Sequence, residues 1–554
     1  MRNAAILAIL TAVSALAQNP PLAPLRGAPP PAPIGLDRYV QSQEALIRLG
    51  KALFWDMQVG SDGVTACATC HFHAGADHRI QNQLSGPAAT INQRLTAQDF
   101  PFHRLSNPGN NNSAVLSDKR QVAGSMGVVS KSFQYVDAGA PQEQAANQSA
   151  PAQFLVNGIL VRQVTGRNTP SVINAVYNAR NFWDGRALTT FTTTALSWND
   201  GQLQPELVRI ENASLASQAV GPALNSTEMS WSGRSWPELG RKLRHLRPLT
   251  RQRVASSDSV LGPIANADGN GLHPLYTYEF LIQAAFRPEY WAASDIEVGY
   301  TQADRNFELF WGLAIQAYES TLISDDTRVD QFLSGRTEAL SPLEVQGLNQ
   351  FRAGGSQCLN CHNGPESTSA GWTGFNRQAQ AFFRIGVTPI PDDAGIGLGA
   401  FKTPSLRNVE FTGPYFHDGG QATLEQVLDF YNRNGDFPAG GNLGPGIGNI
   451  RLGGNNRNSI VAFLKAFSDD RVRFQRAPFD HPSLCVPNGH AELAPGMLIL
   501  DDAQQGSVAQ DTFAHIPEVG REGATVPLQT FEELLQGIGN DGSRAHAMNS
   551  ACQP

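Results

Sequence analysis

Two copies of one short motif constrain this chain more than any other feature of its sequence. CATCH occupies residues 67–71 and CLNCH occupies residues 358–362. In a C-x-x-C-H sequence the two thiols can form thioether bonds to a haem, and the adjoining histidine can ligate the iron. A zinc site would need a second ligand pair near each copy, and a thioredoxin-type dithiol would need a βαβ context; we find neither pattern. The motifs therefore predict two covalently bound haem c groups. The predicted attachment residues are Cys67, Cys70, His71, Cys358, Cys361 and His362.

The N-terminus has the pattern of an export signal, which we assign to residues 1–17. Arg2 is followed by an apolar run over 4–13 that is too short to span a bilayer, and then by the small-residue pattern Ala15-Leu16-Ala17. We expect cleavage near Ala17 and a periplasmic or otherwise exported protein; an uncleaved membrane anchor is the alternative. We expect no membrane span in the mature chain, and the net charge of −8 disfavours a nucleic-acid partner.

Two cysteines, Cys485 and Cys552, lie outside the motifs. In an oxidising compartment they are expected to form a disulfide, the alternative being two free thiols. The bond would close a long loop, and the chain-entropy model gives a stabilisation of roughly 4 kcal/mol.

The hydrophobic pattern predicts a mainly α fold with long loop insertions. Residues 18–34 are rich in proline and are expected to form an extended linker. Residues 80–150 have weak periodicity and are expected to form an irregular insertion, and 471–554 a C-terminal extension. Helices are expected within 39–56, 169–185, 305–323, 341–355, 423–435 and 459–467.

Several blocks, in order, resemble the bacterial di-haem cytochrome c peroxidase family, which includes the MauG enzymes. They include LGKALFWD before CATCH, GRNTPSVINAVYNARNFWDGRA, QAVGPALNSTEM, AYESTLIS, and FKTPSLRNVEFTGPYFHDGG after CLNCH. The resemblance covers about 45–470. It implies two cytochrome c-type domains: a peroxidatic domain with insertions at 35–325 and an electron-transfer domain at 326–470.

The resemblance also implies roles for individual residues. His71 would be the proximal ligand of the peroxidatic haem, and His362 that of the second haem. Trp183 matches the tryptophan between the two haems; a plain core aromatic is the alternative. Glu228 matches the distal catalytic glutamate, which exchanges protons with peroxide, and Gln218 matches its neighbouring glutamine. Without the resemblance, Glu228 would be taken as an exposed loop residue.

A calcium site is implied at Asn168, Thr412 and Pro414, because they match positions that supply oxygen ligands between the two domains. The alternative is that they are ordinary loop residues. NADGNG at 266–271 only faintly resembles a calcium loop and lacks its final glutamate, so a turn is expected there.

Two positions bear on the subclass. Many family members carry a histidine ligand for the resting peroxidatic haem just before the Asn-x-Pro segment, but residues 154–168 contain none. His73, His78 and His103 are the other candidates, unless they are exposed loop residues. If none of them binds the iron, the site is open and needs no reductive activation.

The second position lies fourteen residues after His417 and holds Tyr431, where many members have a methionine and MauG has a tyrosine. An oxygen ligand would favour the more oxidised iron states. Tyr431 also lies on an apolar helical face, so a core role is the alternative. Ser356 replaces the surface tryptophan through which MauG receives electrons from its protein substrate.

The sequence therefore predicts a periplasmic di-haem peroxidase. Hydrogen peroxide would be reduced at the His71 haem, with electrons relayed through the second haem from a small donor protein such as a cytochrome c or a cupredoxin. The first alternative is a MauG-like oxidase, in which the two haems share oxidising equivalents and act on Trp or Tyr of a partner protein. A di-haem electron carrier without catalysis is the second alternative.

Overall fold

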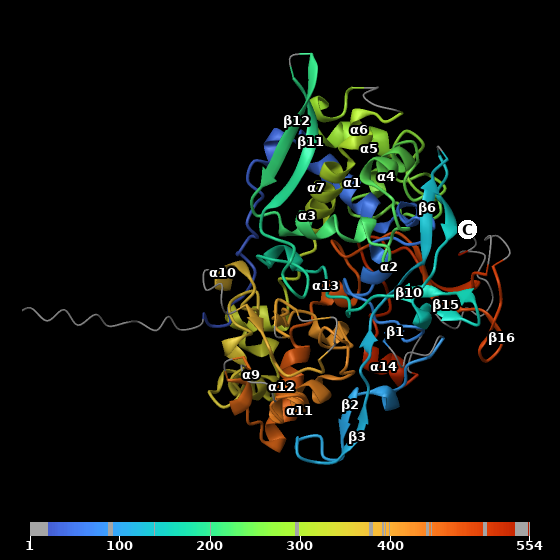
Figure 1. Cartoon of the computed structure of the whole chain (residues 1–554). Helices are drawn as coiled ribbons and strands as arrows, with labels where there is room; N and C mark the ends of the chain where they lie inside the picture. Colours follow the sequence, from blue (N-terminus) through green and yellow to red (C-terminus); the bar gives the residue numbers. More distant parts are fainter. Residues whose placement is uncertain are drawn as a thin grey trace, which may run out of the picture.

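The computed structural model describes most of the chain outside its two ends (Figure 1). The described residues are 20–86, 92–137, 139–199, 201–293, 299–375, 381–389, 393, 395–397, 399–438, 443–444, 446–501, 507–537 and 552. The expected export signal lies outside them. Within the described part, no helix is long and apolar enough to cross a membrane.

The larger helical unit is built around α1 (Gln43–Trp55) and α7 (Phe307–Glu319). Ser42 caps α1 by accepting a hydrogen bond from the Ala45 backbone N–H. The two helices pack closely because α1 carries Gly50, where a Cβ would lie 1.9 Å from the Ala314 carbonyl oxygen. The other helices of this unit are α3 (Ser214–Ala219), α4 (Trp236–Arg244), α5 (Tyr278–Ala285) and α6 (Gln302–Arg305).

The smaller unit repeats this packing between α9 (Pro342–Arg352) and α12 (Gly454–Lys465). A Cβ on Gly347 of α9 would lie 1.9 Å from the Ser459 carbonyl oxygen. In each unit, the helix that precedes a C-x-x-C-H motif therefore uses a glycine to approach a later helix. The unit also contains α8 (Arg328–Leu333), α10 (Trp372–Phe375) and α11 (Leu424–Asn432).

The insertions hold antiparallel strand pairs, so the expectation of irregular loops over 80–150 was wrong. Within the described residues the strands pair two by two. The main pairs are β2 (His103–Leu105) with β3 (Val115–Asp118), β5 (Met126–Val129) with β10 (Arg162–Val164), β6 (Lys131–Tyr135) with β7 (Gln144–Asn147), and β11 (Phe191–Asn199) with β12 (Gln202–Ile210). The shorter strands are β1 (Leu84–Ser85), β4 (Val122–Ala123), β8 (Leu155–Val156), β9 (Ile159–Leu160), β13 (Phe382–Phe383), β14 (Phe401–Lys402), β16 (Glu492–Ala494) and β17 (Met497–Leu498).

The helix expected over 169–185 is absent from these described residues, which form turns with one 3-10 turn at Ala175–Tyr177. Asn174 and Phe182 have φ of 60° and 63°, outside the range of a right-handed helix. The Asn174 side chain exchanges hydrogen bonds with the backbone of Ser324, which explains why this turn replaces a helix.

The C-terminal extension folds back onto the larger unit. Its helices are α13 (Asp470–Arg473) and α14 (Phe531–Leu535), and its main strands are β15 (Leu484–His490) and β18 (Asp511–Ile516). Figure 1 places β15 beside β10 and near α2 (Ala68–His71). The expected disulfide between Cys485 and Cys552 is confirmed, with a Cα–Cα distance of 5.6 Å.

The proline-rich segment is held at two points rather than free along its described part. Leu22 and Leu25 are buried, and the Leu25 backbone N–H donates to an Asp330 carboxylate oxygen at 2.9 Å. Leu22 therefore contributes to the core of the smaller unit, whereas Leu25 packs against Tyr177 and Leu215.

Candidate functional site

The first C-x-x-C-H motif forms the single turn of α2. His71 places its Nδ1 2.8 Å from the carbonyl oxygen of Gly75, so this nitrogen can donate there and leave Nε2 for a metal. Burial lowers the pKa of His71 and so favours the neutral ring that a metal ligand requires. Cys67 and Cys70 are unpaired thiols.

The Glu228 loop lies directly beside this motif. Met229 brings its sulfur to 3.9 Å from that of Cys67. Burial raises the pKa of the Cys67 and Cys70 thiols, and the negative charge of Glu228 raises both further. Burial also raises the pKa of the Glu228 carboxyl, while the charge of Arg186 opposes this. The structure therefore brings Glu228 next to the first motif.

The turn that follows Gln218 is linked to Glu228 by way of Phe182. It lies near the end of α3, and the turn that follows packs Gly221 against the Phe182 ring. Arg186, whose charge acts on Glu228, lies with its guanidinium 3.8 Å from the centre of that ring. Phe182 and Arg186 thus link the Gln218 turn to the glutamate.

The second motif borders a cavity of about 610 Å³. Cys358, Cys361 and His362 line it, and His362 Nδ1 lies 3.3 Å from the Ser367 carbonyl oxygen. As in the first motif, this leaves Nε2 of the histidine for a metal. Burial lowers the pKa of His362 to about 4, which keeps its ring neutral.

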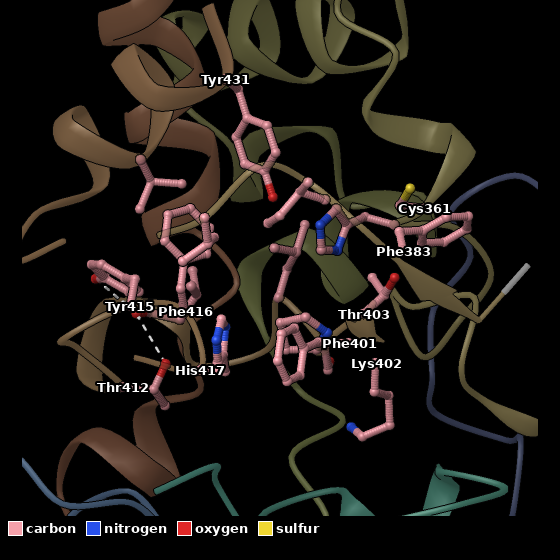
Figure 2. Close-up of a pocket in the computed structure, with 18 of the residues that line it drawn as sticks. Cys361, Phe383, Phe401, Lys402, Thr403, Thr412, Tyr415, Phe416, His417 and Tyr431 are labelled. Atoms are coloured by element: carbon pink, nitrogen blue, oxygen red, sulfur yellow. Dashed lines mark hydrogen bonds between the residues drawn. The ribbon is translucent and has the colours of Figure 1, made fainter. Parts of the chain in front are cut away.

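Tyr431 lines the same cavity from α11. Figure 2 shows its hydroxyl pointing into the space that Cys361 also borders. Burial raises the pKa of the phenol, and the Cys361 and Cys358 thiols raise it further, so a nearby cation would be needed to stabilise the phenolate. The hydroxyl is therefore placed as an oxygen ligand would require, while the ring packs edge-on against Phe416 and Phe430, as a core residue also would.

Trp183 lies at the junction of the two units and also lines the second cavity. Its indole N–H donates to the Asn168 carbonyl oxygen at 2.8 Å. Thr169 follows Asn168 in the chain, and its hydroxyl lies 2.7 Å from that of Ser125. Ile173 lines both the second cavity and a small cavity that includes His71. Residues 168–173 therefore extend from one motif to the other.

The expected calcium positions come partly together. The Asn168 side-chain nitrogen donates to the carbonyl oxygens of Pro414 and Phe416, at 2.5 and 3.2 Å. Rotation of that amide by 180° would point its oxygen toward the same carbonyls. Thr412 lines the same cavity as Asn168 and Pro414. The 266–271 stretch is a turn, as expected, with Asp268 accepting from the Asn270 backbone N–H.

The three other candidate histidines are buried, so the alternative that they are exposed loop residues is wrong. His73 and His78 stack with ring centres 3.4 Å apart, and His73 packs edge-on to Phe411. His103 pairs with Asp118 through Nδ1 at 3.1 Å and lies near Phe437. His103 is therefore engaged by β3 and the smaller unit.

Both motifs fit a covalently bound haem. Each offers two unpaired thiols and a histidine whose Nδ1 is already engaged by a backbone carbonyl. The sequence did not single out Lys402, which is buried at the second cavity, where burial lowers its pKa to about 8. The sequence did not single out Glu319 either. This residue is buried, and burial raises its pKa to about 8.

The sequence of this chain matches a known protein family. The model of the di-haem cytochrome c peroxidase family matches residues 44–338. A cytochrome c551 peroxidase from Nitrosomonas europaea is 28% identical over 320 residues, which cover 56% of this chain and 67% of that protein. The methylamine utilization protein MauG from Methylophilus methylotrophus is 22% identical over 310 residues, covering 56% of this chain and 70% of the relative.

A solved structure of a MauG-like protein associated with microbial copper homeostasis covers 81% of this chain and 95% of its own, at 19% identity and a TM-score of 0.47. The family match extends over more than half of the chain and includes the first motif, Trp183, Gln218 and Glu228. The chain therefore belongs to the di-haem cytochrome c peroxidase family, whose members are oxidoreductases that use peroxide.

Proposed function

We propose that this protein reduces hydrogen peroxide at the His71 haem, with electrons relayed through the His362 haem. The observation that carries the proposal is the position of the Glu228 loop: the Met229 sulfur lies 3.9 Å from that of Cys67, and the charge of Glu228 acts on both thiols of the first motif. The haem, when bound, supplies the iron centre and the electrons that cleave the O–O bond.

Glu228 would move the protons of this reaction. Its carboxylate takes a proton from one oxygen of hydrogen peroxide and returns it to the oxygen that leaves as water. One peroxide, two electrons and two protons give two water molecules. Burial raises the pKa of Glu228 toward the range in which it can both accept and release a proton, and Arg186 limits the rise. Gln218 would orient the peroxide as a hydrogen-bonding neighbour.

Trp183 is proposed as the bridge for electrons between the two haems. Its place in the second cavity and its hydrogen bond to Asn168 support this role. A small donor protein, a cytochrome c or a cupredoxin, would deliver the electrons. We infer export to the periplasm from the N-terminal sequence; the disulfide supports it.

A calcium ion is proposed at Asn168, Thr412 and Pro414. The approach of the Asn168 amide to the Pro414 carbonyl supports it, because amide and carbonyl oxygens are the ligands that Ca²⁺ prefers. Metal analysis of the dialysed protein should find calcium equimolar with the chain. A content well below that would contradict the site.

A second candidate function is a MauG-like oxidase that removes electrons from Trp or Tyr of a partner protein. Tyr431 favours it, since its hydroxyl enters the second cavity. Ser356 disfavours it, because the position is buried and its hydroxyl donates to the Phe351 carbonyl oxygen at 2.9 Å. We therefore keep peroxide reduction as the primary function.

The proposal is tested by the substitution Glu228→Gln, with Glu338→Gln as an exposed control. The first should slow peroxide reduction by about 10²–10⁴-fold while haem content stays unchanged, because it removes the proton-transfer group. The control should react like the wild-type protein. A Glu228→Gln variant with wild-type turnover would contradict the proposal.

A further inference from the structure

The C-terminal extension lies outside the family match, yet it contacts the first motif and its surroundings. Arg79 connects the two, since its guanidinium donates to the carbonyl oxygens of Thr69, inside the motif, and of Pro487 on β15. Leu160 makes two backbone hydrogen bonds with the extension. Its N–H donates to the Ser507 carbonyl oxygen, and its carbonyl oxygen accepts from the Ala509 N–H.

Arg162, two residues further along, is the point where three segments meet. Its Nε donates to Asp511 of the extension at 2.7 Å, and its Nη1 donates to Asp62 at 2.9 Å. Asp62 in turn accepts hydrogen bonds from the backbone N–H groups of Val64 and Thr65, at the entry to the first motif. Only 3% of Arg162 is exposed, so its charge depends on these partners.

The third segment is β5, which lies against the Glu228 loop. Arg162 Nη1 donates to the Gly127 carbonyl oxygen at 2.8 Å. A Cβ on Gly127 would lie 1.9 Å from the carbonyl oxygen of Thr227 and 2.8 Å from that of Glu228, so the two backbones are in direct contact. The neighbouring Val128 N–H donates to the Thr227 carbonyl oxygen at 3.2 Å.

Gln163 reinforces this contact, because its side-chain amide donates to the Ser226 carbonyl oxygen at 2.7 Å. A continuous set of contacts thus runs from Asp511 through Arg162 and Gly127 to the backbone of Glu228. The Arg162–Asp511 hydrogen bond is partly buried, the Arg162–Gly127 hydrogen bond is buried, and the Gly127 contact with the Glu228 loop admits no extra atom.

We propose that Arg162 is a positioning residue for Glu228, and that the C-terminal extension, through Asp511, completes the wall that holds the Glu228 loop beside the first motif. The inference rests on the proposed role of Glu228. A displacement of the proton-transfer group by about 1 Å can lower a rate by as much as a hundredfold, so the wall matters for rate as well as for stability.

The test uses the full-length holoprotein with Asp511→Asn, which keeps the size of the side chain and removes its charge. The matched control is Glu518→Gln. Glu518 also joins the extension to an arginine of the larger unit, Arg253, at 2.7 Å, but more than half of the Arg253 side chain is exposed.

For Asp511→Asn, we expect kcat/KM for hydrogen peroxide to fall about tenfold while KM for the electron donor is unchanged. Cyanide binding should slow as well, because hydrogen cyanide must give up its proton to a base near the first haem. Glu518→Gln should match the wild-type protein in both measurements. The inference is overturned if Asp511→Asn reacts like the wild type, or if Glu518→Gln loses as much.

If Asp511→Asn does not yield holoprotein, Gly127→Ala tests the same inference. It should lower kcat/KM about a hundredfold, whereas Gly166→Ala, at a glycine with no neighbouring atom within 4 Å of the added Cβ, should not. Unchanged kcat/KM in Gly127→Ala would overturn the inference. Glu228→Gln separates the proposed function from the positioning role. If Glu228→Gln lowers kcat/KM while Asp511→Asn and Gly127→Ala leave it unchanged, only the positioning role is contradicted.

Discussion

The two C-x-x-C-H motifs end in equivalent histidines but have different surroundings. Around His71 the chain adds β5 from an insertion, the Glu228 loop and β15 from the extension. Around His362 it leaves a cavity of about 610 Å³, into which Tyr431 points its hydroxyl.

The difference is the one expected if the two haems have the separate roles proposed above. A site that reduces peroxide needs a proton-transfer group held at a fixed distance, and the extra segments contact the backbone of the loop that carries Glu228, the group proposed for this role. A site that relays electrons, the role proposed for the second haem, needs a bridge to its partner haem, and the second cavity is bordered by Trp183, the proposed bridge, and by Tyr431. The same attachment motif can thus serve two functions because its surroundings differ.

The largest expected effect comes from the double substitution Cys485→Ser and Cys552→Ser. Loss of the disulfide should lower the free energy of unfolding by roughly 4 kcal/mol, as judged from chain entropy. Because Cys485 lies on β15, cyanide binding at the first haem should change, while the spectrum of the second haem should not. Denaturant unfolding and cyanide titration measure the two effects. Equal disturbance of both haems would contradict the separate roles.

Tyr431→Phe should act on the second haem alone. Loss of an oxygen ligand should raise its reduction potential by on the order of 0.1 V, because such a ligand favours the oxidised iron. Spectroelectrochemical titration would measure this shift, and stopped-flow mixing with peroxide would show an unchanged initial rate at the first haem. An unchanged potential would mean that Tyr431 is not a ligand.

The smallest expected effect is a pH dependence near the first site. Burial raises the pKa of Glu319 to about 8, well above that of an unfolded glutamate, so the folded state binds its proton more tightly. The resulting stability is complete at low pH and is lost as pH rises through 8. Between pH 6 and pH 8 the loss should be about 2 kcal/mol. Glu319→Gln should remove that slope from urea unfolding curves; an unchanged slope would contradict the assignment.

The sequence predicted the elements that have strong local signals. α9 begins at Ser341-Pro342 with the Ser341–Glu344 capping box, and α11 begins at the cap Thr423. The helix predicted over 169–185 was wrong because the turns of this segment are fixed by hydrogen bonds to residues far along the chain, such as Ser324. The β11–β12 hairpin did carry a local signal, since Asp200-Gly201 separates its two strands in the sequence, and this signal was overlooked.

The candidate site likewise contains residues that the sequence predicted and residues that it could not. The attachment residues follow from a five-residue motif, and Glu228 and Trp183 follow from the resemblance to a family. Arg162 and Asp511 could not be found from sequence, because their contact joins positions 349 residues apart and neither lies in a motif. Sequence reasoning therefore predicted the residues of the proposed chemistry and missed Arg162 and Asp511, which we propose position one of them.

The most direct test of the account is an absorption spectrum of the resting ferric protein before and after stoichiometric hydrogen peroxide, with no reductant present. The absence of a histidine from residues 154–168 and the position of Glu228 predict an immediate change at the first haem. A near-infrared band would further indicate that the two haems share the oxidising equivalents. If no change occurs until one electron per chain has been added, a further ligand closes the first haem, and the account of an open peroxide site is wrong.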